Sequence, residues 1–452
     1  MYRKISVISV TCLLLVMAAG CIKNDIPYPR RLGKITAFEV QGQIGKAVVD
    51  SVARTVSVDV ADTVDLALVR LVRFEVSDGT AVSPSPDSLA VLDLTEPFEF
   101  VLSTYPGQNY LWTVTAEYAE EQAPGVDAWA TVAYVKDVLP SVQGTPGIRW
   151  RKADSDQWQE TTDLKLSGDS ASVVLRGLTP ATAYVYRMYA ADKEGPEVSF
   201  TTEEARQMPN MSFDEWNITG GIVYPNADQG ENAWWDSGNT GARLGGKVPT
   251  SQETEFLAVP GEGKSAVRME TVNAIIAMAG GNIFSGSFGS IQGLGAEVFF
   301  GRPFDTRPLR LTGYYSYEPQ VINNVKAPQN VPLPFDASTI MGRMDRCCIF
   351  VYVTDWDGPF RVNTTEHVYL DVNDPHVIGY GQLVDSVGTG GEYRQFTVDI
   401  KYRSHRKPTY CAVVAVASQY ADFFTGGIGS LMYADEFAFE YDGEAVWEEG
   451  YR

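Results

Sequence analysis

The densest group of residues that could do chemistry lies between Trp234 and Arg243. Two adjacent tryptophans stand there with the polar side chains of Asp236, Asn239 and Arg243, in a stretch whose composition is typical of a loop. Flat aromatic rings can stack on the apolar C–H face of a sugar, and short polar groups can hold its hydroxyls. Neighbouring residues of an extended chain face opposite ways. We therefore expect one of Trp234 and Trp235 to plug the core, while the other is partly exposed and could stack on a saccharide.

A second group, Asp355-Trp356-Asp357, follows the predicted strand Ile349–Thr354. A loop after a strand is a common place for a ligand rim, and two aspartates around an aromatic ring could hold sugar hydroxyls or a calcium ion. The same residue types also make an ordinary β-turn. The sequence leaves both interpretations open.

The sequence gives little support for a bound metal ion other than calcium. Asp435 and Glu436 lie at the start of the last predicted strand and could bind a structural calcium ion or simply cap the sheet. No CxxC motif occurs, so zinc has no support and no other cofactor is expected. Cys347 and Cys348 would face opposite sides of a strand, which leaves either buried free thiols or one bridge to Cys411.

A glycoside hydrolase would need two carboxyl groups about 5–5.5 Å apart for retention, or about 6.5–9.5 Å apart for inversion. The sequence does not show which acids converge, so no catalytic residue is assigned. The three histidines, His367, His376 and His405, lack a partnered serine or cysteine motif, and triad chemistry is unsupported. The acids that could form a pair are Asp214, Glu215, Asp236, Glu297, Asp355, Asp357, Asp435 and Glu436.

The elements that must position these residues are strands. Gly (41) and Pro (24) are plentiful and aromatics reach 12%, which favours many short strands joined by turns. No helix of convincing length is predicted in the last part of the chain, where a two-sheet jelly roll fits best. Its predicted strands are Ala296–Phe300, Leu309–Tyr315, Ile349–Thr354, Phe396–Lys401, Ala412–Ala417 and Glu436–Tyr441. The expected fold is all-β: two small sandwiches followed by a larger jelly roll.

Length suggests about three domains, which we place at residues 34–122, 127–203 and 208–445. The first resembles the small immunoglobulin-like domains of surface lipoproteins. In the second, Leu178, Pro180 and Tyr184 have the spacing of the tyrosine corner of fibronectin type III sandwiches. That resemblance implies a fold and says little about activity.

The N-terminus reads as a targeting signal over residues 1–20, with a positive start and a short apolar run. Ala18, Ala19 and Gly20 precede Cys21, which resembles a bacterial lipobox, and the cysteine would then carry the lipid. Residues 21–33 form a tether. We expect an outer-membrane lipoprotein on the periplasmic or cell-surface face, held to the membrane only by its lipid.

The formal charge is −21, so phosphate backbones should repel the chain, and nucleic acid is excluded as a partner.

The segment from Phe213 to the end resembles the PCMD family, the putative carbohydrate metabolism domain. The resemblance implies a jelly roll in glycan-related proteins of outer-membrane uptake systems, and it brings no established catalytic pair. The motifs that carry it are Phe213-Asp-Glu-Trp216, Tyr224-Pro-Asn226, Trp234-Trp-Asp-Ser-Gly-Asn239, Val248-Pro-Thr250, Ala279-Gly-Gly-Asn282, Gly301-Arg-Pro-Phe304, Gly313-Tyr-Tyr-Ser-Tyr317 and Phe423-Phe-Thr-Gly426.

The sequence thus favours a lipoprotein of glycan acquisition whose last domain binds a polysaccharide or oligosaccharide. Outer-membrane glycan-uptake proteins are its expected partners. A glycoside hydrolase and a structural or adhesive spacer are the alternatives.

Overall fold

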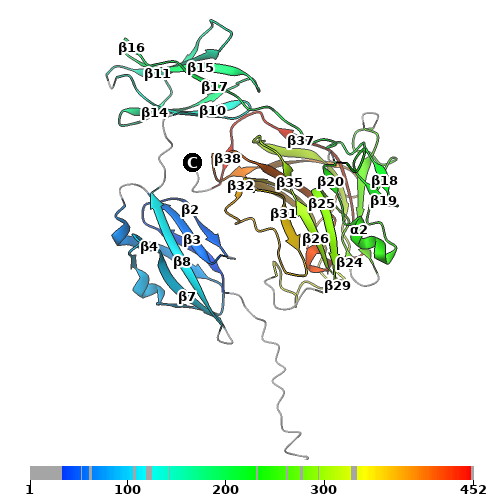
Figure 1. The fold of residues 1–452 in the computed structure, drawn as a ribbon. Coiled ribbons are helices and arrows are strands. Elements are labelled where there is room, and N and C mark those ends of the chain that lie inside the picture. The colour runs from blue at the N-terminus through cyan, green and yellow to red at the C-terminus, as the bar shows by residue number, and fades with distance from the viewer. Residues whose placement is uncertain are drawn as a thin grey trace, which may run out of the picture.

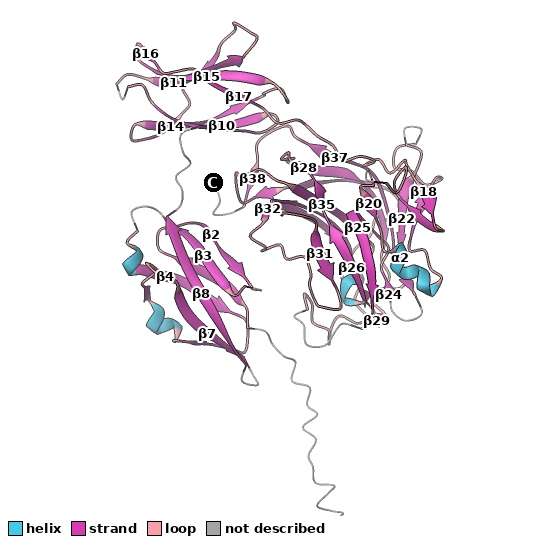
Figure 2. Cartoon of the chain, in the orientation of Figure 1, coloured by secondary structure: helices cyan, strands magenta, loops and turns pink. Residues whose placement is uncertain are grey.

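The computed structural model describes residues 33–448, apart from 52, 61–63, 105–107, 119–124, 142, 231–232, 261–262, 275–277, 294 and 327–332. Within these ranges nearly every element is a strand, and the few helices are single turns (Figure 1, Figure 2). The all-β prediction is confirmed. The signal segment, Cys21 and most of the tether lie outside the described residues. No helix in the described part of the chain is long and apolar enough to cross a membrane.

The first unit holds two sheets, with strand orders β1-β4-β6 and β2-β3-β8-β7-β5. Alternating residues such as Val58, Phe100 and Trp112 fill the core between them. The strands β3 and β8 pair in parallel, whereas the other pairs are antiparallel. The strands are β1 Ile35–Val40, β2 Gln43–Asp50, β3 Thr55–Val60, β4 Val69–Val76, β5 Thr80–Ser83, β6 Val91–Leu92, β7 Phe98–Thr104 and β8 Gln108–Tyr118, with the short helices η1 Leu66–Leu68 and η2 Pro86–Leu89.

The second unit pairs the sheet β13-β14-β10-β9 with the sheet β12-β11-β15-β16, in which β17 also joins β15. The N–H of Thr179 donates to Tyr184 Oη at 2.9 Å, which is the contact that the tyrosine-corner spacing predicts. The strands are β9 Gly125–Ala128, β10 Val132–Val138, β11 Pro146–Lys152, β12 Gln159–Thr161, β13 Lys165–Ser167, β14 Ser170–Arg176, β15 Ala183–Ala190, β16 Lys193–Glu194 and β17 Val198–Thr201. β9 begins two residues before the predicted start at 127.

The third unit is a sandwich of two large sheets. The ten-stranded front sheet has the order β31-β26-β25-β35-β30-β32-β34-β38. In addition, β20 pairs with β25 and β27 pairs with β35. Its strands are β20 Trp235–Asp236, β25 Asn282–Gln292, β26 Gly295–Phe300, β27 Arg302–Pro303, β30 Cys347–Thr354, β31 Phe360–Asn363, β32 Val377–Asp385, β34 Lys401–Tyr402, β35 Tyr410–Val416 and β38 Val446–Trp447.

The back sheet has the order β21-β22-β37-β28-β33. Its strands are β21 Thr250–Glu253, β22 Ala266–Glu270, β28 Arg310–Glu318, β33 Arg394–Asp399 and β37 Leu431–Glu440. Smaller elements around the sandwich are β18 Asn217–Thr219, β19 Ile222–Tyr224, β23 Val272–Asn273, β24 Met278–Ala279, β29 Asn324–Val325, β36 Thr425–Gly426, α2 Asn239–Ala242, η3 Arg243–Gly245 and η4 Ala421–Phe423. All six strands predicted for this unit are present, with ends that differ by a few residues.

Strand alternation divides the front sheet into two faces. In β30, the side chains of Ile349, Val351 and Val353 are fully buried against the back sheet. The residues between them, including Phe350 and Tyr352, point to the other face of the sheet. We call this the cavity face, because a hollow lies over it.

The second and third units share a buried ionic contact. The guanidinium of Arg307 is fully buried and lies 2.8 Å from Asp127 Oδ1 and 2.7 Å from Glu203 Oε1. It also stacks over Trp129, with its Cζ 4.4 Å from the ring centroid. Asp127 bonds to His405 Nδ1 at 2.7 Å. Burial alone would raise the pKa of Asp127, but the hydrogen bond from His405 and the charge of Arg307 outweigh burial and lower it. These contacts fasten the two units together.

The sheet register rules out the disulfide that the sequence left open. Cys348 pairs with Val416 and Cys411 pairs with Val353, so Cys348 and Cys411 lie about five residues apart along neighbouring strands. Five strand residues span roughly 17 Å, whereas a disulfide needs Cα atoms within about 7 Å. Cys347, Cys348 and Cys411 are buried free thiols.

Candidate functional site

The segment from Trp234 to Arg243 is built into the fold and is not an open loop. It forms strand β20 at the side of the front sheet and then helix α2. The side chain of Trp235 is only 1% exposed, and its Nε1 donates to the Pro209 carbonyl at 2.7 Å. Trp234 is partly buried and packs on the same core. The prediction that one of the pair plugs the core is confirmed, and Trp235 cannot stack on a sugar because its ring is enclosed.

The polar residues of this segment are occupied by the backbone. Asp236 is buried and accepts the N–H groups of Ser237 and Phe288, and its desolvation raises the pKa of its carboxyl. Asn239 accepts from the N–H of Thr250 at 3.0 Å and donates back to the carbonyl of Thr250 at 2.8 Å. Arg243 is exposed and donates to the Gly220 carbonyl. Asp236 and Asn239 therefore hold the chain together here and are not available to a ligand, which corrects the predicted binding role.

The turn after β30 is likewise structural. Trp356 is 6% exposed and belongs to a hydrophobic cluster on the cavity face. Asp355 bonds to His376 Nδ1 at 2.9 Å and forms an ion pair with Arg406. Asp357 stays exposed to water. Of the predicted ligand-binding residues in this turn, Trp356 is too enclosed to offer a stacking face.

The weak calcium pair also has protein partners. Asp435 is fully buried, and its carboxylate accepts the N–H groups of Ala258 and Glu436 at 2.9 and 3.0 Å. Burial raises the pKa of this carboxyl. Among the described residues, no cluster of three or more His, Cys, Asp or Glu side chains could hold a metal ion.

The cavity lies on the cavity face of the front sheet and has a volume of about 1170 Å³. Its floor is formed by alternate residues of β25, β26, β30 and β35, which strand geometry points away from the core. Most of these side chains are apolar, Tyr352 adds a hydroxyl, and the rings of Phe288, Phe350 and Tyr352 remain partly exposed. The floor residues are Phe284, Phe288, Val298, Phe300, Cys348, Phe350, Tyr352, Val414 and Val416.

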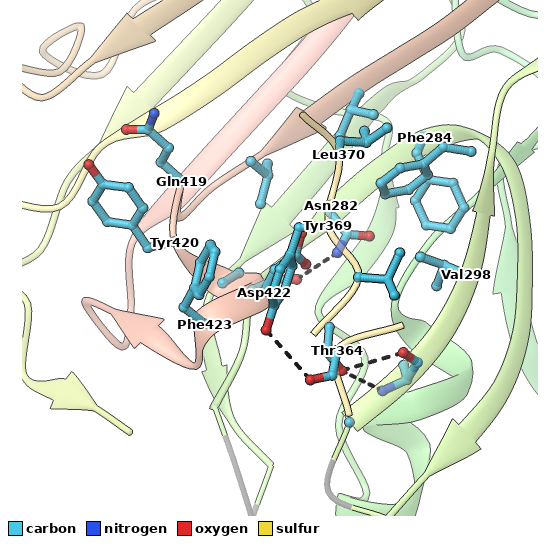
Figure 3. A pocket seen from close by; sticks show the side chains of 18 of the residues that line it. Asn282, Phe284, Val298, Thr364, Tyr369, Leu370, Gln419, Tyr420, Asp422 and Phe423 are labelled. Atoms are coloured by element: carbon cyan, nitrogen blue, oxygen red, sulfur yellow. Dashed lines mark hydrogen bonds between the residues drawn. The ribbon is translucent and has the colours of Figure 1, made fainter. Parts of the chain in front are cut away.

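One wall of the cavity carries an acid beside two stacked aromatic rings (Figure 3). The rings of Tyr369 and Phe423 stack with centroids 4.5 Å apart, and the Tyr369 hydroxyl donates to the Thr364 carbonyl. Asp422 lies beside them on η4. Water reaches this carboxyl through the open cavity, yet protein surrounds it closely enough that desolvation raises its pKa to about 6.

Further polar groups stand around the apolar floor. Asn282 begins β25, Gln382 lies within β32 as the cross-strand partner of Phe350, and Asp371 lies on the loop that follows Tyr369. The first unit also reaches this cavity, through Lys34 and Asp50. A ligand in the cavity would meet both apolar surface and hydrogen-bonding groups.

The model of the family described as "Putative carbohydrate metabolism domain", PCMD, matches residues 212–440. The chain belongs to the PCMD family. The predicted family resemblance is confirmed, and no curated protein matches the chain.

Solved structures similar to this PCMD chain include two putative glycoside hydrolases. One is from Bacteroides thetaiotaomicron VPI-5482, with 17% identity and a TM-score of 0.36, covering 92% of this chain and 99% of that one. The other is from Bacteroides vulgatus ATCC 8482, with 19% identity and a TM-score of 0.35, covering 50% and 89%. A carbohydrate-binding module of the β-sandwich superfamily shares 9% identity at a TM-score of 0.20, covering 71% and 98%.

The sequence of the PCMD chain offers eight acids as candidates for a hydrolytic pair. None of these eight lines the cavity. The acids that do are Asp50, Asp371, Asp374 and Asp422. Sequence reasoning did not group these four acids into one site, because they lie in segments that only the fold brings together. One usable signal was β30 itself, which is apolar at nearly every position. Both faces of such a strand must either pack against protein or offer apolar surface to a ligand.

Proposed function

We propose that the PCMD domain binds an oligosaccharide or polysaccharide in the cavity over its front sheet. The observation that carries this proposal is the pairing of partly exposed aromatic rings with hydrogen-bonding side chains in a cavity of about 1170 Å³. Sugars need both, because their rings have apolar faces and a rim of hydroxyls. The family description, which refers to carbohydrate metabolism, agrees with this ligand class.

A glycan array with the purified protein, followed by calorimetry on each hit, tests the proposal. The variant Phe350→Ala removes a floor ring, and we expect it to weaken binding about tenfold, or about 1.4 kcal/mol. Phe299→Ala is the matched control, because Phe299 is a partly exposed phenylalanine of the same sheet that does not line the cavity. Equal losses in both variants, or no glycan retained by the array, would count against the proposal.

A glycosidase is the second function that a specific observation favours. With its pKa raised to about 6, Asp422 could donate a proton to a leaving group near neutral pH. Asp371 and Asp374 line the same cavity and could supply the second carboxylate. Release of reducing ends from a glycan panel, lost in Asp422→Asn with glycan binding retained, would support hydrolysis. Binding without any release would leave the chain a binder.

The proposed setting is a lipoprotein anchored through Cys21 in the outer membrane. In that setting the first two units would hold the PCMD domain away from the lipid and could serve a partner of glycan uptake. Labelling of Cys21 by a radioactive fatty acid, absent in Cys21→Ser, tests the anchor.

A further inference from the structure

The first unit supplies part of the cavity wall, although it is a separate sandwich. Lys34 lies just before β1, and Asp50 and Ser51 lie at the end of β2; all three line the cavity together with the PCMD domain. A short turn joins β1 to β2, so the start of one strand and the end of the other lie at the same end of the unit. The side chains of Lys34 and Ser51 are exposed, and an ammonium and a hydroxyl can both hydrogen-bond to sugar hydroxyls.

A chain of polar contacts sets the first unit beside one wall of the cavity (Figure 1). Lys46 of β2 lies 2.9 Å from Glu448, and Glu448 also forms an ion pair with Arg403. Arg403 in turn donates to the Val372 carbonyl. Val372 belongs to the loop 364–376, which lines the cavity along most of its length. The first unit is therefore held next to a loop that brings hydrogen-bonding groups into the cavity.

This link between the units is weak by itself. The Lys46 side chain is 51% exposed, and pairs of this kind contribute little because water screens them. Among the described residues, the apolar cores of the first unit and of the PCMD domain have no member in common. A ligand that contacts both units stabilises their association by mass action. The cavity volume of about 1170 Å³ exceeds the usual upper limit of ligand pockets, about 1,000 Å³, so it has room for such a ligand.

We propose that the cavity binds a chain of several sugars that contacts both units, and that Lys34 and Ser51 of the first unit form part of the binding site. This inference rests on the proposed sugar-binding function and specifies the ligand as an oligosaccharide. One part of the sugar chain lies over the rings of the PCMD domain, such as that of Phe350. Another part meets Lys34 and Ser51, so binding of a long chain couples the two units.

A length series of one glycan tests this proposal. For each glycan that the array retains, calorimetry on the purified protein compares oligosaccharides from the disaccharide to the octasaccharide. Lys34→Glu should lower the ratio of octasaccharide to disaccharide affinity about tenfold, as expected for the loss of one hydrogen bond to a charged group. Arg70→Glu is the matched control, because it makes the same change of charge at an exposed residue of the same unit that does not line the cavity. It should leave the ratio unchanged.

Hydrogen exchange gives a second measurement that needs no variant. The octasaccharide should slow exchange in the peptides that contain Lys34 and Ser51, because a ligand that binds the folded first unit opposes its local opening. The disaccharide should slow exchange in the PCMD domain alone.

The outcomes separate this inference from the function beneath it. If Lys34→Glu and Arg70→Glu change the affinity ratio equally or not at all, or if the octasaccharide leaves exchange in the first unit unchanged, the inference is wrong and sugar binding by the PCMD domain stands. An array that retains no glycan overturns both.

Discussion

At the scale of single residues, a side chain that suits a sugar site can equally well build a core. Trp235 packs edge-to-face with Phe213, with centroids 5.2 Å apart, and its Nε1 is bonded to the backbone. Its neighbour Trp234 keeps part of its surface in water. The pair shows that strand alternation predicts which aromatic ring is exposed better than residue type does.

We expect Trp235→Ala to lower the free energy of unfolding by about 3–5 kcal/mol, because it leaves a large cavity in a sealed core. Denaturant unfolding measures the loss. Trp234→Ala is the matched control and should cost less, since its side chain is only partly buried. A Trp235→Ala variant as stable as the wild type would contradict the packing described here.

Asp422 should make stability depend on pH in a defined window. Desolvation raises its pKa from 3.8 to about 6 in the folded protein, so the folded chain holds this proton to higher pH than the unfolded chain does. The resulting stabilisation is fully present below about pH 3.8 and is lost as the pH rises through about 6. Relative to Asp422→Asn, the wild type should therefore lose stability between pH 4 and 6 and then level off. Asp357→Asn, in an exposed turn, controls for the loss of one surface carboxylate, and a constant difference across this window would refute the shift.

At the scale of elements, the strands of the third unit could be read from the sequence. Ile349–Thr354 and Ala412–Ala417 were predicted as strands, and they correspond to β30 and β35. The sequence could not show which face of these strands stays open. That depends on where distant side chains such as Tyr369 and Phe423 come to rest, and local patterning does not carry this information. The same reason explains why the acids of the cavity were not grouped into one site.

The register of β30 and β35 also predicts the behaviour of the thiols. Burial raises the pKa of Cys348 to about 12, and it raises the pKa of Cys347 and Cys411 as well. Because the thiolate is the reactive form, none of the three should react with a thiol reagent in the folded protein, and all three should react after unfolding. Mass spectrometry of labelled peptides measures this. A peptide that joins Cys411 to Cys347 or Cys348 before reduction would show that the register is wrong.

At the scale of the whole molecule, contacts between units differ greatly in strength. Lys46 Nζ of the first unit lies 2.9 Å from Glu448 Oε1 near the C-terminus, but the lysine side chain is 51% exposed. Exposed pairs of this kind contribute about 0–1 kcal/mol. This pair therefore holds the first unit, which also lines the cavity through Lys34, only weakly to the PCMD domain. The second unit is joined to the PCMD domain by fully buried charge.

Arg307 is the residue on which that second junction depends. Removing its guanidinium takes from Asp127 and Glu203 the buried cation that they share, and breaking a buried ion pair typically costs about 3–5 kcal/mol. We expect Arg307→Met to unfold at lower denaturant concentration and to separate the unfolding of the second unit from that of the PCMD domain. Arg307→Lys should rescue little, because one ammonium cannot reproduce the forked contacts to two carboxylates and two carbonyls. Arg243→Met, at an exposed arginine, is the control and should behave as the wild type. A single transition in Arg307→Met with unchanged stability would mean that the units are joined by their shared apolar core alone, to which Trp129 belongs.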